Sequence, residues 1–197
     1  MPTSRLEAFS DGVFAIAFTL LVLDFHPPTD LNHTAHYLLL LWPSYIAYLI
    51  SVFLIGLVWA NHHSVFIHIK YTNRMLTFLN VLLLAVVALL PFPTQVLADA
   101  IHSTHGLNAA TFFYGLVITL GGLAHNAIWL YAIRHPQLLN KSATPALIAG
   151  VRKWLFFGPV SYAVCTLISL VLPWLAIVGY AALIIFYWLP PRSEAEI

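Results

Sequence analysis

Apolar residues along the chain form six long runs that are separated by short polar segments. A helix needs about 20 mostly apolar residues to cross the hydrocarbon core of a bilayer, and most of these runs approach or exceed that length. The pattern therefore predicts an all-α membrane protein with six transmembrane helices, which form one domain over residues 1–197. The predicted spans cover residues 4–24, 37–63, 76–97, 109–133, 154–172 and 174–188.

Prolines mark points where these helices begin, bend or stop, because proline lacks a backbone N–H and restricts the residue before it. Pro91 and Pro93 lie inside the third span, where we expect a kink, and Pro159 predicts a bend in the fifth. Pro173 marks the turn between the fifth and sixth spans. Thr144, followed by proline, matches a helix N-cap and predicts a short interfacial helix before the fifth span.

The first span has an unusually polar entrance. Its first two turns contain Glu7, Ser10 and Asp11, and only residues 13–23 are nearly all apolar. Ser4 and Glu7 have the spacing of a capping box, so we expect Ser4 to be the N-cap. An apolar run this short is more typical of a helix that packs inside a protein than of a span that faces lipid.

The apolar part of this helix has two chemically different faces. At about 100° per residue, one narrow stripe carries aliphatic side chains and a hydroxyl, and aromatic side chains lie opposite. The stripe consists of Gly12, Ile16, Thr19, Leu20 and Leu23. Aliphatic residues with this spacing occur on many membrane helices, so ordinary helix packing also explains the stripe. A helix whose aromatic face packs on its own protein would turn the stripe towards a symmetry axis.

Basic residues predict the orientation of the spans. With six spans, all eight Lys and Arg residues fall on one side of the membrane, namely at the two termini and in the second-to-third and fourth-to-fifth loops. By the positive-inside rule, both termini are predicted to be cytoplasmic. The eight residues are Arg5, Lys70, Arg74, Arg134, Lys141, Arg152, Lys153 and Arg192.

Composition agrees with an integral membrane protein, since 61% of the residues are hydrophobic and only 8% are charged. The net charge of +1 provides no basic surface for nucleic acid, so we expect no nucleic-acid partner. The single cysteine, Cys165, lies inside an apolar run and is expected to serve in packing.

Polar residues inside the predicted spans gather at one depth, near the cytoplasmic side. A carboxylate at this depth is costly unless it is paired, so we expect a buried Asp11 and Ser10 to meet the 59–62 segment or Arg74. We interpret this inner polar belt as a structural device that fixes the first helix at its angle; an ion-binding site is the alternative. The belt comprises Arg5, Phe9, Ser10, Asp11, Trp59, Asn61, His62 and Arg74, and Asn80, His125 and Asn126 lie at a similar depth.

Ten histidines raise the question of a metal site. His62 and His63, with His68, faintly resemble a histidine box, but adjacent helical residues point about 100° apart, so the first two cannot both face one ion. Several other histidines are scattered through the outer loops, whereas a metal site needs several convergent ligands. We therefore expect no cofactor and no enzyme activity, and a membrane-embedded metal enzyme is a minor alternative.

One motif resembles a known family. The pattern Arg5-x-x-x-Phe9-Ser10-Asp11, running into the aliphatic stripe, resembles the signature of the transmembrane protein 175 family. This family consists of the endolysosomal potassium channels of animals and their smaller bacterial relatives. The resemblance covers the first helix closely and the six-helix layout more loosely.

The resemblance implies that the first helix lines a pore. In the family, aliphatic rings on this helix form the constriction, and a hydroxyl is linked to cation selection. Counted from the Phe-Ser-Asp triplet, the rings fall on Ile16, Leu20 and Leu23, and the hydroxyl on Thr19. The motif occurs once, as in the bacterial members, so the resemblance implies a homotetramer. One pore-lining helix per chain cannot enclose a channel without symmetry-related copies.

The expected function is a potassium-permeable cation channel in a bacterial plasma membrane, with a homotetrameric pore lined by the first helix. The expected partners are copies of the chain, membrane lipids and monovalent cations, with K⁺ as the permeant ion. The chain contains no Thr-Val-Gly-Tyr-Gly filter, so selectivity would come from side chains, and gating from widening and rewetting of the apolar constriction. A secondary transporter is the main alternative, although that class usually has inverted repeats and broken helices near the midplane.

Overall fold

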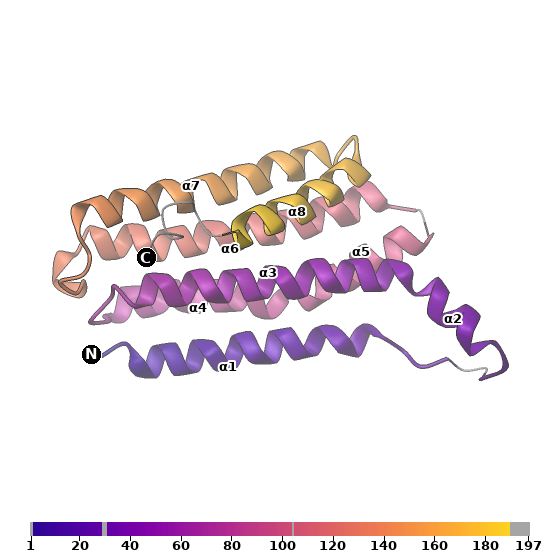
Figure 1. The fold of residues 1–197 in the computed structure, drawn as a ribbon, viewed down its shortest axis with the longest axis horizontal. Coiled ribbons are helices and arrows are strands. Elements are labelled where there is room, and N and C mark those ends of the chain that lie inside the picture. The colour runs from indigo at the N-terminus through magenta and orange to yellow at the C-terminus, as the bar shows by residue number, and fades with distance from the viewer. Residues whose placement is uncertain (1, 29–30, 104, 190–197) are drawn as a thin grey trace.

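The computed structural model describes residues 2–28, 31–103 and 105–189, and the elements of regular structure in these ranges are helices (Figure 1). The α-helices are α1 (Ser4–Leu20), α2 (Thr34–Leu40), α3 (Trp42–Phe66), α4 (Arg74–Leu89), α5 (Pro91–Ser103), α6 (Leu107–Ile133), α7 (Pro145–Ile168) and α8 (Pro173–Trp188). Short 3₁₀ helices are η1 (Leu21–Asp24), η2 (Leu31–His33) and η3 (Pro136–Leu138).

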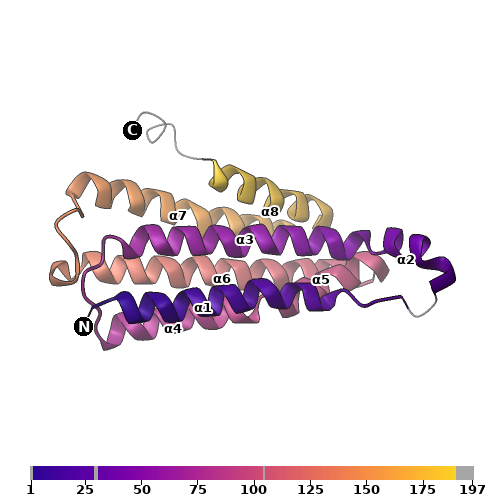
Figure 2. The same cartoon turned by 60° about the horizontal axis from the view of Figure 1, so that its bottom comes forward.

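The long helices form a bundle along one axis. Helices α1, α3, α6, α7 and α8 and the α4–α5 pair lie side by side, and α2 lies beyond one end (Figures 1 and 2). Helix α6 is central, because it packs against α4, α5, α7 and α8. Helix α1 lies at an edge, where it packs against α3 and α4.

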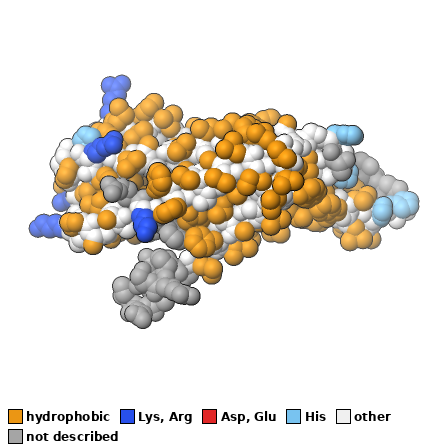
Figure 3. Space-filling view, turned by 90° about the horizontal axis from the view of Figure 1, so that it is seen from above, with side chains coloured by type: hydrophobic (Ala, Val, Ile, Leu, Met, Phe, Trp, Pro, Cys, Tyr) orange, Lys and Arg blue, Asp and Glu red, His pale blue; other side chains and the backbone are white. Residues whose placement is uncertain are grey.

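The surface of the bundle is that of an integral membrane protein. Among the described residues, four helical segments are long and apolar enough to cross a membrane: Ser4–Asp24, Trp42–Phe66, Arg74–Ser103 and Leu107–Ile133. Hydrophobic side chains cover much of the face in Figure 3, while Lys and Arg gather at the end where α1 begins and most of the visible His side chains lie at the opposite end. Of the basic residues used to predict orientation, Arg192 lies outside the described ranges.

The third span is interrupted at Leu90, between α4 and α5, at the place where Pro91 and Pro93 predict a kink. Pro91 begins α5, and its missing N–H removes one hydrogen bond of the helical ladder. The Thr94 hydroxyl donates to the Leu90 carbonyl oxygen at 2.8 Å, which adds a hydrogen bond beside the break. The two helices therefore continue in one rod although the backbone pattern is interrupted.

Two predicted helix starts are wrong. The second span begins at Trp42, not at residue 37, because Pro43 cannot donate into a preceding helical turn and instead occupies the first turn of α3. At the N-terminus, Ser4 is already helical; the Thr3 carbonyl oxygen accepts the amides of Leu6 and Glu7 at 2.8 and 2.9 Å. Thr3 is therefore the N-cap, although its side chain makes no capping bond.

The start of the fifth span was predicted in part. Thr144 is the N-cap of α7, and its hydroxyl oxygen accepts the Leu147 amide at 3.3 Å, as expected. The helix then runs without interruption from Pro145 to Ile168, so residues 145–153 form the first turns of α7; their interfacial position stays a prediction. The predicted turn before α8 is confirmed, since Pro173 is the first residue of that helix.

A buried layer of hydroxyls holds the other helices together in the half of the bundle away from the start of α1. Ser51 on α3 hydrogen-bonds to Thr94 Oγ1 on α5 at 2.7 Å and to Tyr114 Oη on α6 at 2.9 Å. Tyr180 on α8 donates to Thr166 Oγ1 on α7 at 3.3 Å. These polar groups are satisfied by one another, as burial requires.

Gly115 of α6 is needed for this layer. A Cβ at position 115 would overlap the Tyr180 hydroxyl and Thr166 Oγ1. We expect Gly115→Ala to lower the free energy of unfolding by about 1–3 kcal/mol, the usual range for overpacking. Gly150→Ala on α7 is the control, because its added Cβ has no atom within 4 Å. Denaturation of the purified variants in detergent checks this, and equal stability would contradict the account of the layer.

Candidate functional site

Helix α1 has one buried and one exposed side. Ser10, Phe14, Ala17 and Leu21 are buried against the bundle. The opposite side, called the outer face of α1, is the predicted stripe of Gly12, Ile16, Thr19, Leu20 and Leu23, and all five residues are exposed in the single chain. Phe18, which belongs to the aromatic side that we expected to pack, is also exposed, so the packed side of α1 is narrower than the sequence predicts.

Two aliphatic side chains of the outer face project clearly from the chain. Ile16 is 60% exposed and Leu23 is 67% exposed, whereas Leu20, which lies nearer the packed side, is 40% exposed. An apolar surface of this kind, on a helix at the edge of the bundle, requires lipid or another protein to cover it.

The last turn of this helix tightens. Helix α1 ends at Leu20, and η1 continues the rod as a 3₁₀ helix. Because a 3₁₀ helix has about three residues per turn, side chains three positions apart eclipse one another. Leu23 therefore lies almost directly above Leu20 along the axis, which aligns the two side chains more closely than the uniform helical wheel predicted.

Thr19 is the polar member of the outer face. Its side chain is exposed, and the hydroxyl donates to the Ile16 carbonyl oxygen at 2.9 Å. Since the hydroxyl proton is used inside the helix, the lone pairs of Oγ1 remain available outside it. The arrangement leaves an oxygen that can act as a weak ligand for a cation.

The inner polar belt has a buried part that joins three helices. The Asn80 side chain on α4 donates from Nδ2 to Ser10 Oγ on α1 at 2.9 Å, and its Oδ1 lies 2.8 Å from His62 Nε2 on α3. Because Oδ1 can only accept, His62 Nε2 carries the hydrogen. Ser10 Oγ donates in turn to the Leu6 carbonyl oxygen at 2.8 Å. We call this the Ser10–Asn80–His62 network; its three side chains are almost fully buried.

Asp11 lies outside this network. Its Oδ1 accepts a hydrogen bond from Trp59 Nε1 at 2.9 Å, so the two predicted belt residues do meet. Both are exposed in the single chain, however, so Asp11 is not the buried carboxylate that the sequence predicted. The next residue on a helix points about 100° away, and Ser10 already occupies the packed side.

The remaining belt residues are not brought together. Arg5, Phe9 and Arg74 are exposed and Asn61 is half-buried. Within the described ranges, none of the four hydrogen-bonds to Ser10, Asp11, Trp59 or His62. Asn80, which the sequence placed at this depth without assigning a partner, is instead the centre of the network. The sequence feature that could have identified Asn80 as the centre is its amide side chain inside the apolar run of α4.

The histidines do not gather into a ligand set. Over residues 2–28, 31–103 and 105–189, no group of three or more His, Cys, Asp or Glu side chains is placed to hold a metal ion. His62 instead stacks on Phe66, with ring centroids 4.2 Å apart, and meets the edge of Phe14 at 5.5 Å. Its surroundings are those of a packed side chain in the core.

Comparison with known proteins assigns a family to this fold. The family model described as "Endosomal/lysosomal potassium channel TMEM175" matches residues 5–91, which include α1 and the inner polar belt. A protein of Streptomyces collinus named as a potassium channel is 36% identical over 187 residues, 94% of this chain and 91% of the relative. The chain belongs to the TMEM175 family.

Two further relatives extend the comparison of this TMEM175 protein. The crystal structure of a "lysosomal potassium-selective channel TMEM175 homolog" from Chamaesiphon minutus superimposes with a TM-score of 0.82 at 34% identity, covering 94% of this chain and 95% of the other. A Gallus gallus relative named "Endosomal/lysosomal proton channel TMEM175" is 34% identical over 143 residues; the match covers 68% of this chain and 28% of that protein. The family resemblance of the sequence is thus confirmed.

The Ser10–Asn80–His62 network makes a testable prediction. Asn80→Leu keeps the number and branching of the side-chain heavy atoms but leaves the buried His62 N–H without its acceptor. We expect the TMEM175 protein to lose about 2–4 kcal/mol of stability, since a stranded buried group costs about 1–3 kcal/mol and Ser10 also loses its donor. Trp59→Phe, which removes the exposed bond to Asp11 and reduces the ring that stacks on His63, is the control and should cost less. Denaturation measures the loss of stability of each variant. If Asn80→Leu loses less stability than Trp59→Phe, the network does not anchor α1.

Proposed function

We propose that this chain forms a homotetrameric, potassium-permeable channel whose pore is lined by the outer face of α1. The observation that carries the proposal is the exposed aliphatic face of a helix at the edge of the bundle. One such helix encloses nothing, but rotational symmetry would bring copies of the face together around an axis. The names of the bacterial relatives, which are potassium channels, supply the permeant ion.

The constriction follows from the side chains of this face. Rings of Ile16, Leu20 and Leu23 offer ions no replacement for their water, so a narrow bore between them empties and closes. The eclipsed Leu20 and Leu23 form two aligned tiers at one end, and Ile16 forms a ring one turn away from Leu20. Widening the bore admits water and opens the pore.

Selectivity in this proposal resides at Thr19. Four hydroxyl oxygens, each with its proton donated to the Ile16 carbonyl, would face the ion with their lone pairs. Neutral oxygens replace part of the hydration shell of a cation without holding it tightly, which suits conduction. The Ser10–Asn80–His62 network supports this arrangement by fixing α1 on α3 and α4 at the other end of the helix.

Orientation and location complete the proposal. Six rods, namely α1, α3, α4 with α5, α6, α7 and α8, would each cross the membrane of a bacterial cell. Arg5 lies in the first turn of α1 and Arg74 begins α4, and Lys70, Arg134 and Lys141 lie in the loops at the same end of the bundle. The positive-inside rule then places this end and both termini in the cytoplasm. Monovalent cations and membrane lipids are the remaining partners.

The apolar ring is tested by Ile16→Ser. A hydroxyl wets the constriction, so we expect a higher basal current in lipid bilayers; each 1.4 kcal/mol removed from the barrier gives about tenfold more current. Ala15→Ser, which adds a hydroxyl one position away from the ring, is the control. Equal open probabilities for the two variants and the unchanged protein would place the constriction elsewhere.

The hydroxyl ring is tested by Thr19→Val, which keeps the branched shape and removes the oxygen. We expect the reversal potential under opposing potassium and sodium gradients to move towards zero, with gating unchanged. An unchanged reversal potential would remove Thr19 from selection. The same recordings under a pH gradient distinguish a proton conductance, the activity named for the Gallus gallus relative.

A further inference from the structure

A small cavity lies in the bundle away from α1. It lies between α3, α6, α7 and α8 and has a volume of about 70 Å³. We call it the inner cavity. Apolar residues and glycines form much of its wall, and its polar lining residues are Asn61, His125, Asn126, Tyr162 and Tyr187. The proposed pore does not use it.

Three atoms of the lining residues are buried without a hydrogen-bond partner. They are His125 Nε2 and Asn126 Oδ1 on α6 and Tyr162 Oη on α7. The His125 and Tyr162 side chains are only 5% and 7% exposed, so bulk solvent does not satisfy them. Buried polar groups in folded proteins nearly always have a partner, often an ordered water. All three residues line the inner cavity, which has space for such a partner.

The size and charge of the inner cavity restrict the occupant. Because one water takes up about 30 Å³ of liquid volume, the cavity has room for about two. A lipid chain or an organic metabolite does not fit. The described residues that line the cavity include no carboxylate, so nothing there balances the charge of a cation. A neutral molecule that both donates and accepts hydrogen bonds matches the three atoms.

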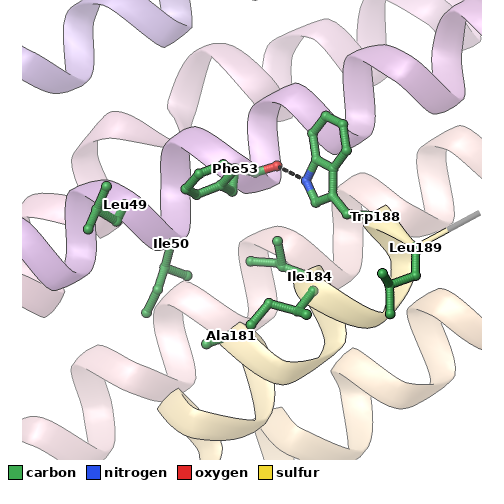
Figure 4. A pocket seen from close by; sticks show the side chains of 8 residues that line it. Leu49, Ile50, Phe53, Ala181, Ile184, Trp188 and Leu189 are labelled. Carbon is green, nitrogen blue, oxygen red and sulfur yellow. Dashed lines mark hydrogen bonds between the residues drawn. The ribbon is translucent and has the colours of Figure 1, made fainter.

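A groove elsewhere on the molecule differs from the inner cavity in its polar groups. The groove between α3 and α8 holds about 510 Å³ and is lined by Leu49, Ile50, Phe53 and other apolar side chains (Figure 4). Its polar Trp188 Nε1 already donates to the Phe53 carbonyl oxygen at 3.0 Å. Among the described residues that line that groove, no buried polar atom lacks a partner, whereas the residues that line the inner cavity have three such atoms.

We propose that the inner cavity is a water-binding site, in which about two ordered waters bridge His125, Asn126 and Tyr162. Water donates to Asn126 Oδ1 and exchanges hydrogen bonds with the other two atoms in either direction. The His125 ring meets the edge of His62, with centroids 6.5 Å apart. The site thus adjoins the Ser10–Asn80–His62 network and continues a polar layer from α1 through the core to α7. It does not depend on the proposed channel function.

The sign of a stability change tests the proposal. If water bridges the atoms, Tyr162→Phe deprives the water of a partner, and the unfolding temperature of the purified protein falls by about 2–4 °C. If the cavity is dry, the same change removes an orphaned hydroxyl, and the unfolding temperature stays level or rises. Tyr180→Phe is the control, because its hydroxyl has direct protein partners and its loss lowers stability in either case.

A high-resolution structure of the purified protein provides a second test that needs no variant. Density within hydrogen-bonding distance of His125 Nε2, Asn126 Oδ1 and Tyr162 Oη supports the water site. An empty cavity overturns it. An anomalous signal at the same position after exchange of potassium for rubidium also overturns it, because a cation would then be the occupant.

Discussion

The buried hydrogen bonds of Asn80 are the interaction on which the arrangement of α1 depends. Asn80 of α4 hydrogen-bonds to Ser10 on α1 and to His62 on α3. Helices α3 and α4 are the two against which α1 packs. In an apolar core, losing either hydrogen bond would leave part of the amide unpaired, which costs several kcal/mol of folding free energy, at most about 7 kcal/mol. Rotating α1 about its axis breaks the bond to Ser10, so the network specifies which side of α1 faces the bundle.

The outer face follows from this anchor. Ser10, Phe14, Ala17 and Leu21 lie along the packed side, so the stripe around Ile16 and Thr19 is turned outwards. The polar end of α1 therefore fixes its position, and the aliphatic end supplies the surface that we propose as the pore. The separation of these roles along one helix explains the polar entrance that the sequence shows before its short apolar run.

Much of this was predictable because local chemistry decided it. Pro91 and Pro173 each begin a helix because proline is tolerated in the first turn, where its missing N–H is not needed, and Thr144 caps α7 through its own hydroxyl. The sequence also predicts the pairing of Asp11 with the 59–62 segment, although that prediction assumes a buried carboxylate and Asp11 is exposed. These inferences required only the positions of residues along one helix or the polarity of a span.

Other features depend on contacts between helices and could not be read from the chain. The tightening at Leu21 depends on the packing of η1 against α3 and α5, so a uniform wheel misplaced Leu23 relative to Leu20. The choice of Asn80 over Arg74 as the partner of Ser10 depends on the rotation of α4. The sequence gives the depth of these residues but not the direction in which they point.

The accessibility of engineered cysteines tests most directly whether the outer face of α1 lines the ion path. In a Cys165→Ser background, which removes the single native thiol, Leu23→Cys and Val22→Cys place thiols at two exposed and neighbouring positions. In a 3₁₀ helix these thiols point about 120° apart. We predict that a positively charged thiol reagent applied from the outside blocks the potassium current of Leu23→Cys and leaves that of Val22→Cys intact. Block of Val22→Cys alone, or of neither although both thiols are labelled, would contradict the account.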